Sequence, residues 1–265
     1  MRSDPVPDDI AEALAAAGAR LGPFEGRFSW HDEVSSTNDL AARMAAHGAE
    51  EGWVVAANSQ TSGRGRLGRT WASPPGAGLY LSVLLRPGAD ALPLLTIAAG
   101  VAIADGVQAA TGVSPRVKWP NDVYIGPRKL AGILAEAGVS SEGVQHVVLG
   151  IGINLLTAAY PPDVGARATS LEAEVGRPCD RGLVLVECLS ALADRYRALE
   201  QGGADAVTSA WRTRAADSVG RAVEWDHEGS PRQGIVHGID SRGALLVGVD
   251  DGVVRVISGE VRWPS

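Results

Sequence analysis

Two apolar segments decide the fold of this 265-residue chain: KLAGILAEA (129–137) and HVVLGIGINLL (146–156). Their apolar residues do not alternate with polar ones, which indicates strands buried on both faces. We therefore expect both segments to be central strands of a sheet that is covered by helices.

Further elements are predicted outward from this pair. The expected strands are 53–57, LYLSVLLR (79–86), RVKWP (116–120) and DVYI (122–125). The expected helices are 9–20, 38–47 with Thr37 as its cap, one opened by Pro93 and running through Ala110, 182–201, and one around Trp211. Beyond Val219, short strands alternate with the turn sequences EGSP, DSRG, DDG and SGE, which is typical of a five- or six-stranded barrel.

These elements predict an α+β protein in which helices flank a mixed β-sheet and a small β-barrel follows. We divide the chain into a short N-terminal segment (1–27), a catalytic domain (28–217) and a C-terminal barrel (218–265). With 45% hydrophobic and 21% charged residues, the chain can bury a core of that size.

Composition excludes several classes of protein. The net charge of -7 gives no global basic field for nucleic acid, so an anion site must be a local cluster. Cys179 and Cys188 fit neither zinc spacing nor a disulfide framework. The N-terminus is acidic and lacks the order of a secretory signal, and no run of about 18 apolar residues stands out. We expect a soluble cytoplasmic protein that binds no membrane.

Lys118 and Lys129 are the only lysines among 24 basic residues. An ammonium is a compact point charge, unlike the planar guanidinium, so these are the positions where that difference would matter. The alternative interpretation is that Lys118 and Lys129 are two surface lysines retained by chance, with no functional role.

The segment SQTSGRGRLGRTW (59–71) places three arginines between three glycines. Glycines let a ligand approach the backbone, and guanidinium groups grip phosphate or carboxylate oxygens. A Rossmann fingerprint would open a helix here, but the following TWASPPGAG cannot form one, and no P-loop motif exists. An isolated run of this kind is also typical of a mobile surface loop. Trp71 stands where such a loop could close over a planar base, although most tryptophans are core residues.

Lys118 in VKWPNDVYI stands at a strand end, and Lys129 enters a buried strand, which is unusual for lysine. An ammonium there could neutralise a carboxylate that attacks phosphorus. Gly132 within the same strand, and Gly150 and Gly152 within GIGIN, suggest close approach of another backbone or of a ligand.

The motifs SSTN (35–38), SQTSGRGRLGRTW (59–71), KWPNDVYI (118–125), RKLAGIL (128–134) and GIGIN (150–154) together resemble those of the biotin protein ligase family, in the family's order. The ending GIDSRGALLV (238–247) is similar to the family's small C-terminal barrel. The resemblance implies a sheet like that of class II aminoacyl-tRNA synthetases, followed by an SH3-like barrel.

The resemblance also implies roles for individual residues. Lys129, Arg66 and Arg69 would be catalytic, and Asp122 would be a magnesium ligand. The implied biotin contacts are Ser36, Thr37, Asn38, Gln60, Gly63, Arg64, Gly65, Arg66, Lys129, Gly132, Gly150 and Gly152. The implied nucleotide contacts are Arg66, Arg69, Trp71, Lys118, Asn121, Lys129 and Asn154, with Trp71 stacking on adenine.

The implied activity joins biotin to ATP as biotinoyl-AMP, with Mg²⁺, and then transfers biotin to a lysine of the biotin carboxyl carrier domain of acyl-CoA carboxylases. Too few residues precede His31 for the family's winged helix, so we expect no operator binding. A lipoate or octanoate ligase, a sensor that binds biotinoyl-AMP without transfer, and a nucleotide-binding scaffold are the rival hypotheses. We expect a monomer or a weak homodimer.

Overall fold

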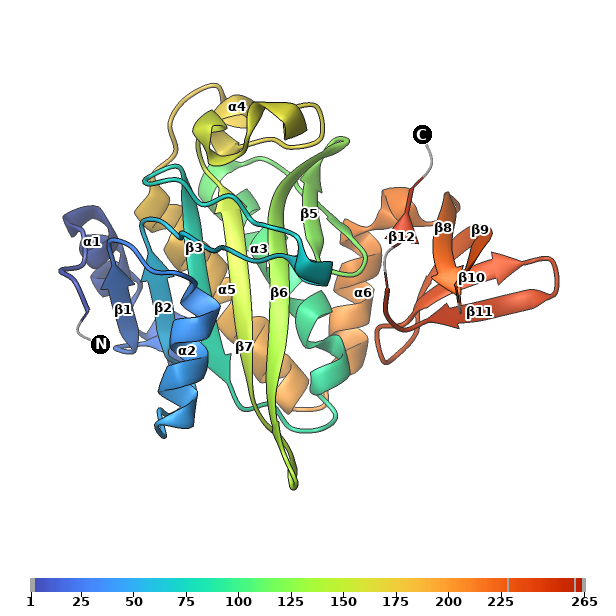
Figure 1. Ribbon diagram of the computed structural model, residues 1–265, viewed down its shortest axis with the longest axis horizontal. Helices are drawn as coiled ribbons and strands as arrows, with labels where there is room; N and C mark the ends of the chain where they lie inside the picture. Colours follow the sequence, from blue (N-terminus) through green and yellow to red (C-terminus); the bar gives the residue numbers. More distant parts are fainter. Residues whose placement is uncertain (1–2, 228, 260, 264–265) are drawn as a thin grey trace.

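The structure is a computed structural model that describes residues 3–227, 229–259 and 261–263. A seven-stranded mixed sheet forms the centre of the larger of two units, and a smaller C-terminal unit follows it (Figure 1). The strand order is β1-β2-β3-β7-β6-β5-β4, and only β1 and β2 pair in parallel. The strands are β1 (Phe28–His31), β2 (Val54–Ala57), β3 (Gly78–Leu85), β4 (Arg116–Lys118), β5 (Asp122–Ile125), β6 (Arg128–Ser140) and β7 (Gly143–Asn154).

The two segments that decide the fold are β6 and β7, which pair with each other near the middle of the sheet. Gly132 stands opposite Gly152 in their register. The prediction of two central strands, and with it the mixed sheet flanked by helices, is confirmed. Gly150 lies two residues before Gly152 on β7 and therefore on the same face of the sheet. The pairing thus brings three glycines from two separate motifs close together.

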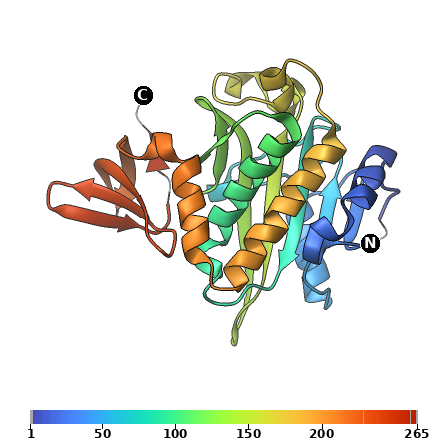
Figure 2. The same ribbon diagram turned by 180° about the vertical axis from the view of Figure 1, so that it is seen from behind.

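Three helices cover one face of the sheet: α3 (Leu95–Thr111), α5 (Arg181–Glu200) and α6 (Ala204–Arg214), which lie in front in Figure 2. Pro93 lies in a short 3-10 turn, Leu92–Leu94, so α3 itself begins two residues later than the sequence suggested. The stretch Leu92–Thr111 is long and apolar enough to cross a membrane, but 67% of its most apolar window is buried in the protein, as in a core helix.

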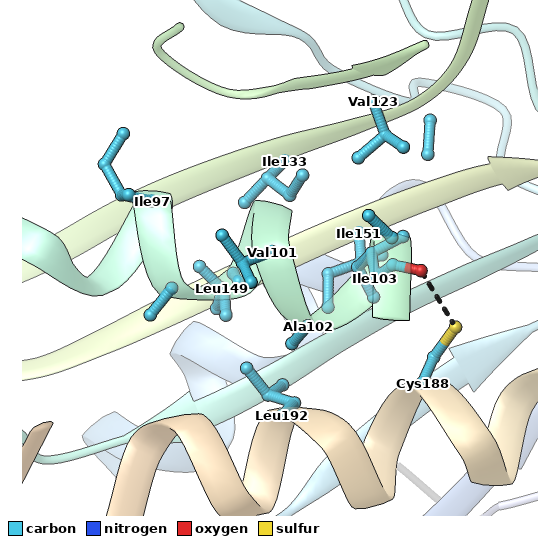
Figure 3. Close-up of a cluster of buried hydrophobic side chains, with 14 of the residues drawn as sticks. Ile97, Val101, Ala102, Ile103, Val123, Ile133, Leu149, Ile151, Cys188 and Leu192 are labelled. Carbon is cyan, nitrogen blue, oxygen red and sulfur yellow. Dashed lines mark hydrogen bonds between the residues drawn. The ribbon is translucent and has the colours of Figure 1, made fainter. Parts of the chain in front are cut away.

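Close packing joins these helices to the sheet (Figure 3). Val101 and Ile103 of α3 are at most 1% exposed, and they meet Ile133 of β6 and Leu149 of β7 in one cluster. Leu192 of α5 closes the cluster from the far side.

Both thiols are outside any disulfide: Cys188 is buried with its Sγ 3.9 Å from the Ile103 carbonyl oxygen, and Cys179 is partly buried.

The opposite face of the sheet carries α2 (Thr37–Ala46), which packs Leu40 and Ala41 on Val55 and Val148. The N-cap of α2 is Ser36, so the prediction that Thr37 caps this helix is wrong. Thr37 is the first helical residue, and its hydroxyl instead bonds to Gln60 and Ser82. This correction matters because it turns Thr37 toward the site described below.

The segment before β1 forms α1 (Asp8–Ala17), whose Ile10 is fully buried and whose Asp9 pairs with Arg181 at the start of α5. After α5 and α6, a five-stranded antiparallel sheet forms the C-terminal unit, in the order β11-β10-β9-β8-β12. Its strands are β8 (Ala222–His227), β9 (Ser230–Ile239), β10 (Leu245–Val249), β11 (Gly252–Val256) and β12 (Val261–Arg262). A small C-terminal antiparallel unit was therefore correctly predicted, and the indole of Trp119 ties it to the larger unit by donating to the Gly243 carbonyl at 2.9 Å.

Candidate active site

The Gly/Arg segment forms a closed loop over the face of the sheet that also carries α2. Two backbone hydrogen bonds cross the loop, from the Gly65 N–H to the Arg69 carbonyl at 2.7 Å and from the Trp71 N–H to the Gly63 carbonyl at 2.9 Å. Gly63 belongs to the base of the loop, because a Cβ there would stand 2.4 Å from the Trp71 carbonyl oxygen. The loop backbone is thus fixed at both ends while the arginines extend from it.

A polar network surrounds the N-terminus of α2. The side-chain carbonyl of Gln60 accepts from the Thr37 N–H at 2.9 Å, and its amide donates to Ser73 at 2.9 Å. Ser82 Oγ lies 2.8 Å from Thr37 Oγ1 and 2.5 Å from Asn38 Oδ1. This set of amides and hydroxyls offers both donors and acceptors in a small buried space, as recognition of a ureido ring requires.

The network continues to the loop through Glu136 on β6. Its Oε2 accepts from Asn38 Nδ2 at 2.5 Å and lies 3.0 Å from a guanidinium nitrogen of Arg64. Arg64 also pairs with Asp39 of α2 at 2.7 Å. Arg64 therefore bridges α2 and β6 across the mouth of the polar network.

Glycines on the sheet leave room for the side chains of Asn38 and Trp71, two of the predicted site residues. A Cβ on Gly150 would stand 2.3 Å from Asn38 Oδ1, and one on Gly152 would stand 2.4 Å from the Trp71 ring. A Cβ on Gly132, across from Gly152, would stand 3.0 Å from the same indole. The glycines therefore fix how close Asn38 and Trp71 come to the strands.

These residues line a first hollow, whose volume is about 50 Å³. Every predicted biotin contact except Gly63 lines it: Ser36, Thr37, Asn38, Gln60, Arg64, Gly65, Arg66, Lys129, Gly132, Gly150 and Gly152. Ligand pockets commonly measure roughly 300–1,000 Å³. The first hollow must therefore widen before it holds a ligand of the size of biotin.

A second hollow of about 440 Å³ adjoins the first. All of the predicted nucleotide contacts and the predicted magnesium ligand line it: Arg66, Arg69, Trp71, Lys118, Asn121, Asp122, Lys129 and Asn154. The two hollows share Gly65, Arg66, Trp71, Asn121 and Lys129. A molecule in the first hollow can therefore meet one in the second at these five residues.

Lys129 stands at this junction. Its ammonium lies 2.6 Å from Asp122 Oδ1 and 5.3 Å from the centre of the Trp71 ring. Arg66 is held close by, with one nitrogen 3.2 Å from Asn121 Oδ1 and another 3.3 Å from the carbonyl oxygen of Gly259 in the C-terminal unit. Asn154, which the family resemblance implies as a nucleotide contact, donates its amide to the Thr169 carbonyl at 2.9 Å.

Lys118 contacts two aromatic rings in the second hollow. Its ammonium is 4.8 Å from the centre of the Tyr124 ring and 5.1 Å from that of Trp263 in the C-terminal unit. Burial is the main cause that lowers the pKa of Lys118, and the negative charge of Asp122 opposes the shift. Cation–π contact stabilises the charged form in such a site.

Asp122 fits the modest demand that Mg²⁺ makes on a protein when it arrives with a nucleotide. Such an ion is commonly held by one or two carboxylates together with phosphate oxygens and water. Within residues 3–227, 229–259 and 261–263, no group of three or more His, Cys, Asp or Glu side chains could hold a metal alone. Asp122 would therefore share the ion with the phosphates.

Three further residues belong to the site although no sequence motif predicted them: Ser82, Glu136 and Trp263. Ser82 had a signal, since it is the one polar residue of LYLSVLL and is fully buried. Glu136 lies on the same strand face as Gly132, four residues further along β6, and this period of two could have placed it at the site. Trp263 carried no signal, because only tertiary packing brings the end of the chain to Lys118.

Comparison with known proteins gives matches over both units. Residues 30–154 match the Biotin/lipoate A/B protein ligase family, and residues 220–262 match the Biotin protein ligase C terminal domain. A Biotin--[acetyl-CoA-carboxylase] ligase of Paracoccus denitrificans is 37% identical over 226 residues, covering 81% of this chain and 91% of that protein. The Bifunctional ligase/repressor BirA of Bacillus subtilis is 32% identical, covering 96% of this chain and 79% of that protein. A solved structure of biotin protein ligase from Aquifex aeolicus, in complex with biotin and ATP, superimposes with a TM-score of 0.79 at 29% identity, covering 90% of this chain and 100% of that one.

Proposed function

Since the chain belongs to the biotin protein ligase family, we propose that it catalyses two consecutive reactions at the paired hollows. Biotin and ATP first form biotinoyl-AMP and pyrophosphate. The biotinoyl group is then transferred to a lysine of the biotin carboxyl carrier domain of an acyl-CoA carboxylase.

One observation carries this proposal: the polar first hollow and the larger second hollow meet at Lys129 and Arg66. Biotin bound with its ureido ring against Thr37, Asn38 and Gln60 directs its carboxylate away from that network, toward the junction. ATP in the second hollow brings its α-phosphate to the same place. The two reacting atoms are thereby held together, which can supply much of the acceleration of a reaction between two molecules.

In the first reaction, a biotin carboxylate oxygen bonds to the α-phosphorus, and the bond from that phosphorus to the bridging oxygen of pyrophosphate breaks. Lys129 and Arg66, together with Arg69 on the exposed side of the loop, spread the negative charge that develops on the phosphate oxygens. Mg²⁺, shared by Asp122 and the phosphates, would neutralise further phosphate charge. The Asp122 carboxylate also holds the Lys129 ammonium at the junction.

In the second reaction, the acceptor lysine amine bonds to the carbonyl carbon of the mixed anhydride, and the bond to AMP breaks. An amide forms, AMP leaves and the amine loses a proton. The Gly/Arg loop covers the anhydride and keeps water away from it, since hydrolysis would waste the intermediate.

Biotin-dependent release of pyrophosphate from ATP and Mg²⁺ tests the first reaction, with lipoate and octanoate as parallel substrates. We expect activity with biotin, because the amides around Thr37 suit a ureido ring and neither of the other acids has one. A preference for lipoate would identify the sister activity within the same family. Tight biotin binding without pyrophosphate release would instead identify a sensor or a scaffold.

Addition of a carrier domain then tests the second reaction through label on its acceptor lysine. We place both reactions in the cytoplasm, where ATP and newly made carboxylase subunits are present. We further propose that the enzyme acts as a monomer or a weak homodimer, which sedimentation across a concentration series measures.

A further inference from the structure

The end of the chain forms one wall of the second hollow. Gly259, Val261 and Trp263 line it, and β12 pairs with β8 directly before Trp263, with Val261 opposite Trp225. The C-terminal unit that carries this wall lies beyond the β5 side of the larger sheet (Figure 1). Because Trp263 contacts Lys118 at the end of β4, the wall stands at the β4 side of the second hollow.

The indole N–H of Trp263 is buried, and within the part of the chain that the structure describes it has no hydrogen-bond partner. An indole nitrogen can donate a hydrogen bond but cannot accept one. A buried donor without a partner is unfavourable, so such groups usually bond to a ligand or to ordered water. Since the Trp263 side chain lines the second hollow, an oxygen atom of a ligand in that hollow is the fitting acceptor.

Lys118 brings a positive charge to the same corner of the second hollow. Its ammonium is 5.1 Å from the centre of the Trp263 ring and 4.8 Å from that of Tyr124. Aromatic faces attract an ammonium without taking up its three N–H donors as oxygen atoms would. A ligand in this corner therefore meets a positive charge together with N–H donors, a combination that suits phosphate oxygens.

The strand order separates this corner from the polar network of the first hollow. The network reaches β7 where Asn38 lies over Gly150, and Lys129 of β6 marks the junction. Asp122 of β5 stands opposite β6 in one register and opposite Lys118 of β4 in the other. Cross-strand partners point to the same face of a sheet. Lys118 thus shares the face of the junction but lies on the side away from the polar network.

The direction of the proposed first reaction follows from this order. Displacement at phosphorus places the attacking oxygen and the leaving oxygen roughly in line, on opposite sides of the phosphorus atom. The biotin carboxylate arrives from the β7 side of the junction. Pyrophosphate must therefore leave toward β5 and β4, and the β- and γ-phosphates of ATP must lie there beforehand. This direction leads to Lys118 and Trp263.

We propose that Trp263 is a contact residue for the β- and γ-phosphates of ATP, to which its indole N–H donates beside the Lys118 ammonium. The same contact holds pyrophosphate after its bond to the α-phosphorus breaks, when the leaving oxygen carries negative charge. The inference rests on the proposed formation of biotinoyl-AMP and deepens it, because it gives the leaving group a site that the C-terminal unit completes.

The test measures two affinities of the full chain: that for inorganic pyrophosphate with Mg²⁺ and that for biotinoyl-AMP, which has no β- or γ-phosphate. Trp263→Phe keeps an aromatic ring near Lys118 and removes the N–H. We expect its Kd for pyrophosphate and its KM for ATP to rise about tenfold, as for the loss of a hydrogen bond to a charged group. Its Kd for biotinoyl-AMP should equal that of the wild type.

Trp225→Phe is the matched control, because Trp225 is a buried tryptophan of the same unit that does not line the second hollow. Both of its affinities should equal those of the wild type. Lys118→Gln is a second variant that leaves the C-terminal unit intact, and it should weaken pyrophosphate binding while sparing that of biotinoyl-AMP.

Three results would overturn the inference: no pyrophosphate binding by the wild type, unchanged affinities in Trp263→Phe, or a loss for biotinoyl-AMP as large as that for pyrophosphate. The last result would mean that Trp263 only supports the wall of the hollow. A wild-type chain that binds pyrophosphate but releases none from biotin and ATP would instead refute the proposed formation of biotinoyl-AMP.

Discussion

The ammonium of Lys129 lies 2.6 Å from Oδ1 of Asp122, at the point where the first and second hollows meet. The two residues belong to adjacent strands, because β5 and β6 pair along their length and Asp122 stands opposite Gly132. Both side chains are about a quarter exposed. The Asp122 carboxylate therefore fixes the Lys129 ammonium at the junction, and the paired strands fix the carboxylate.

We expect Lys129→Ala to reduce biotin-dependent pyrophosphate release by about 10²–10³-fold, the usual cost of losing one preorganised charge-stabilising group. Arg128→Ala is the matched control, since Arg128 is the preceding residue and pairs with Glu174 outside both hollows. Circular dichroism should show both variants folded. Near-normal pyrophosphate release by Lys129→Ala would remove Lys129 from the proposed chemistry.

Much of the fold was predictable from hydrophobic pattern alone. The sequences of β6 and β7 are apolar on both faces, which predicts central strands. In α5 the apolar residues recur at helical spacing: Val184, Leu185, Cys188, Leu189 and Leu192. Boundaries were less accurate: the sequence does not show that the turn around Pro93 is a 3-10 turn rather than the start of α3. The N-cap of α2 was wrong for a similar reason, since Ser36 and Thr37 are both good caps and tertiary contacts with Gln60 and Ser82 decide between them.

The site was predictable where a residue type was out of place, such as Lys129 at the start of a buried strand. It was not predictable where a role depends on two parts of the chain meeting. The carbonyl of Gly259 reaches Arg66, and the Trp263 ring reaches Lys118, only because the C-terminal unit docks against β4 and the Gly/Arg loop. No local pattern contains that information.

The pH dependence of the first reaction should depend on Lys118, whose pKa burial lowers from its usual 10.5. As the pH rises through the lowered pKa, the ammonium loses its proton and its attraction for phosphate, so adenylation should fall. In Lys118→Arg this alkaline decline should move to higher pH, since a guanidinium stays charged. A profile of KM for ATP against pH measures the change, and superimposable alkaline limbs would contradict it.

The same shift has the opposite sign for stability. The folded protein binds the Lys118 proton more weakly than the unfolded chain does, so the free energy of unfolding should increase as the pH rises from the lowered pKa toward 10.5. Denaturant melts of wild type and Lys118→Met across this range isolate the contribution. The difference between the two proteins should vary with pH only within that window.

Gly150→Ala should weaken biotin binding, because the added Cβ would stand 2.3 Å from Asn38 Oδ1 and displace the side chain that Ser82 and Glu136 hold. Overpacking of this kind costs about 1–3 kcal/mol of folding free energy. The displaced Asn38 amide also loses its hydrogen bond to the ureido ring, so the Kd for biotin should rise by up to about tenfold. Gly88→Ala is the control, since its nearest neighbour would be 3.8 Å away. Calorimetric titration with biotin should show the loss in Gly150→Ala alone.

The core between α5 and the sheet should make a large contribution to stability. Leu192→Ala removes a side chain that is fully buried in this core, and it should lower the free energy of unfolding by about 2–5 kcal/mol. Leu183→Ala makes the same chemical change on the same helix at a position that is 40% exposed, and its effect should be much smaller. Urea titrations of the two variants compare burial with helix propensity held constant, and equal losses would mean that α5 does not pack as the structure shows.

Arg66→Ala should release biotinoyl-AMP prematurely. Arg66 connects the Gly/Arg loop to Asn121 on one side and to Gly259 of the C-terminal unit on the other, so its loss removes a contact that holds the loop over the intermediate. The freed adenylate reacts with any lysine it meets, and biotinylation of a bystander such as serum albumin should rise relative to that of the carrier domain. Arg232→Ala, at an exposed position on β9, should keep the wild-type ratio. An unchanged ratio in Arg66→Ala would mean that the loop retains the adenylate without this guanidinium, and the retaining contact would then have to be sought in Arg64, which bridges Asp39 and Glu136.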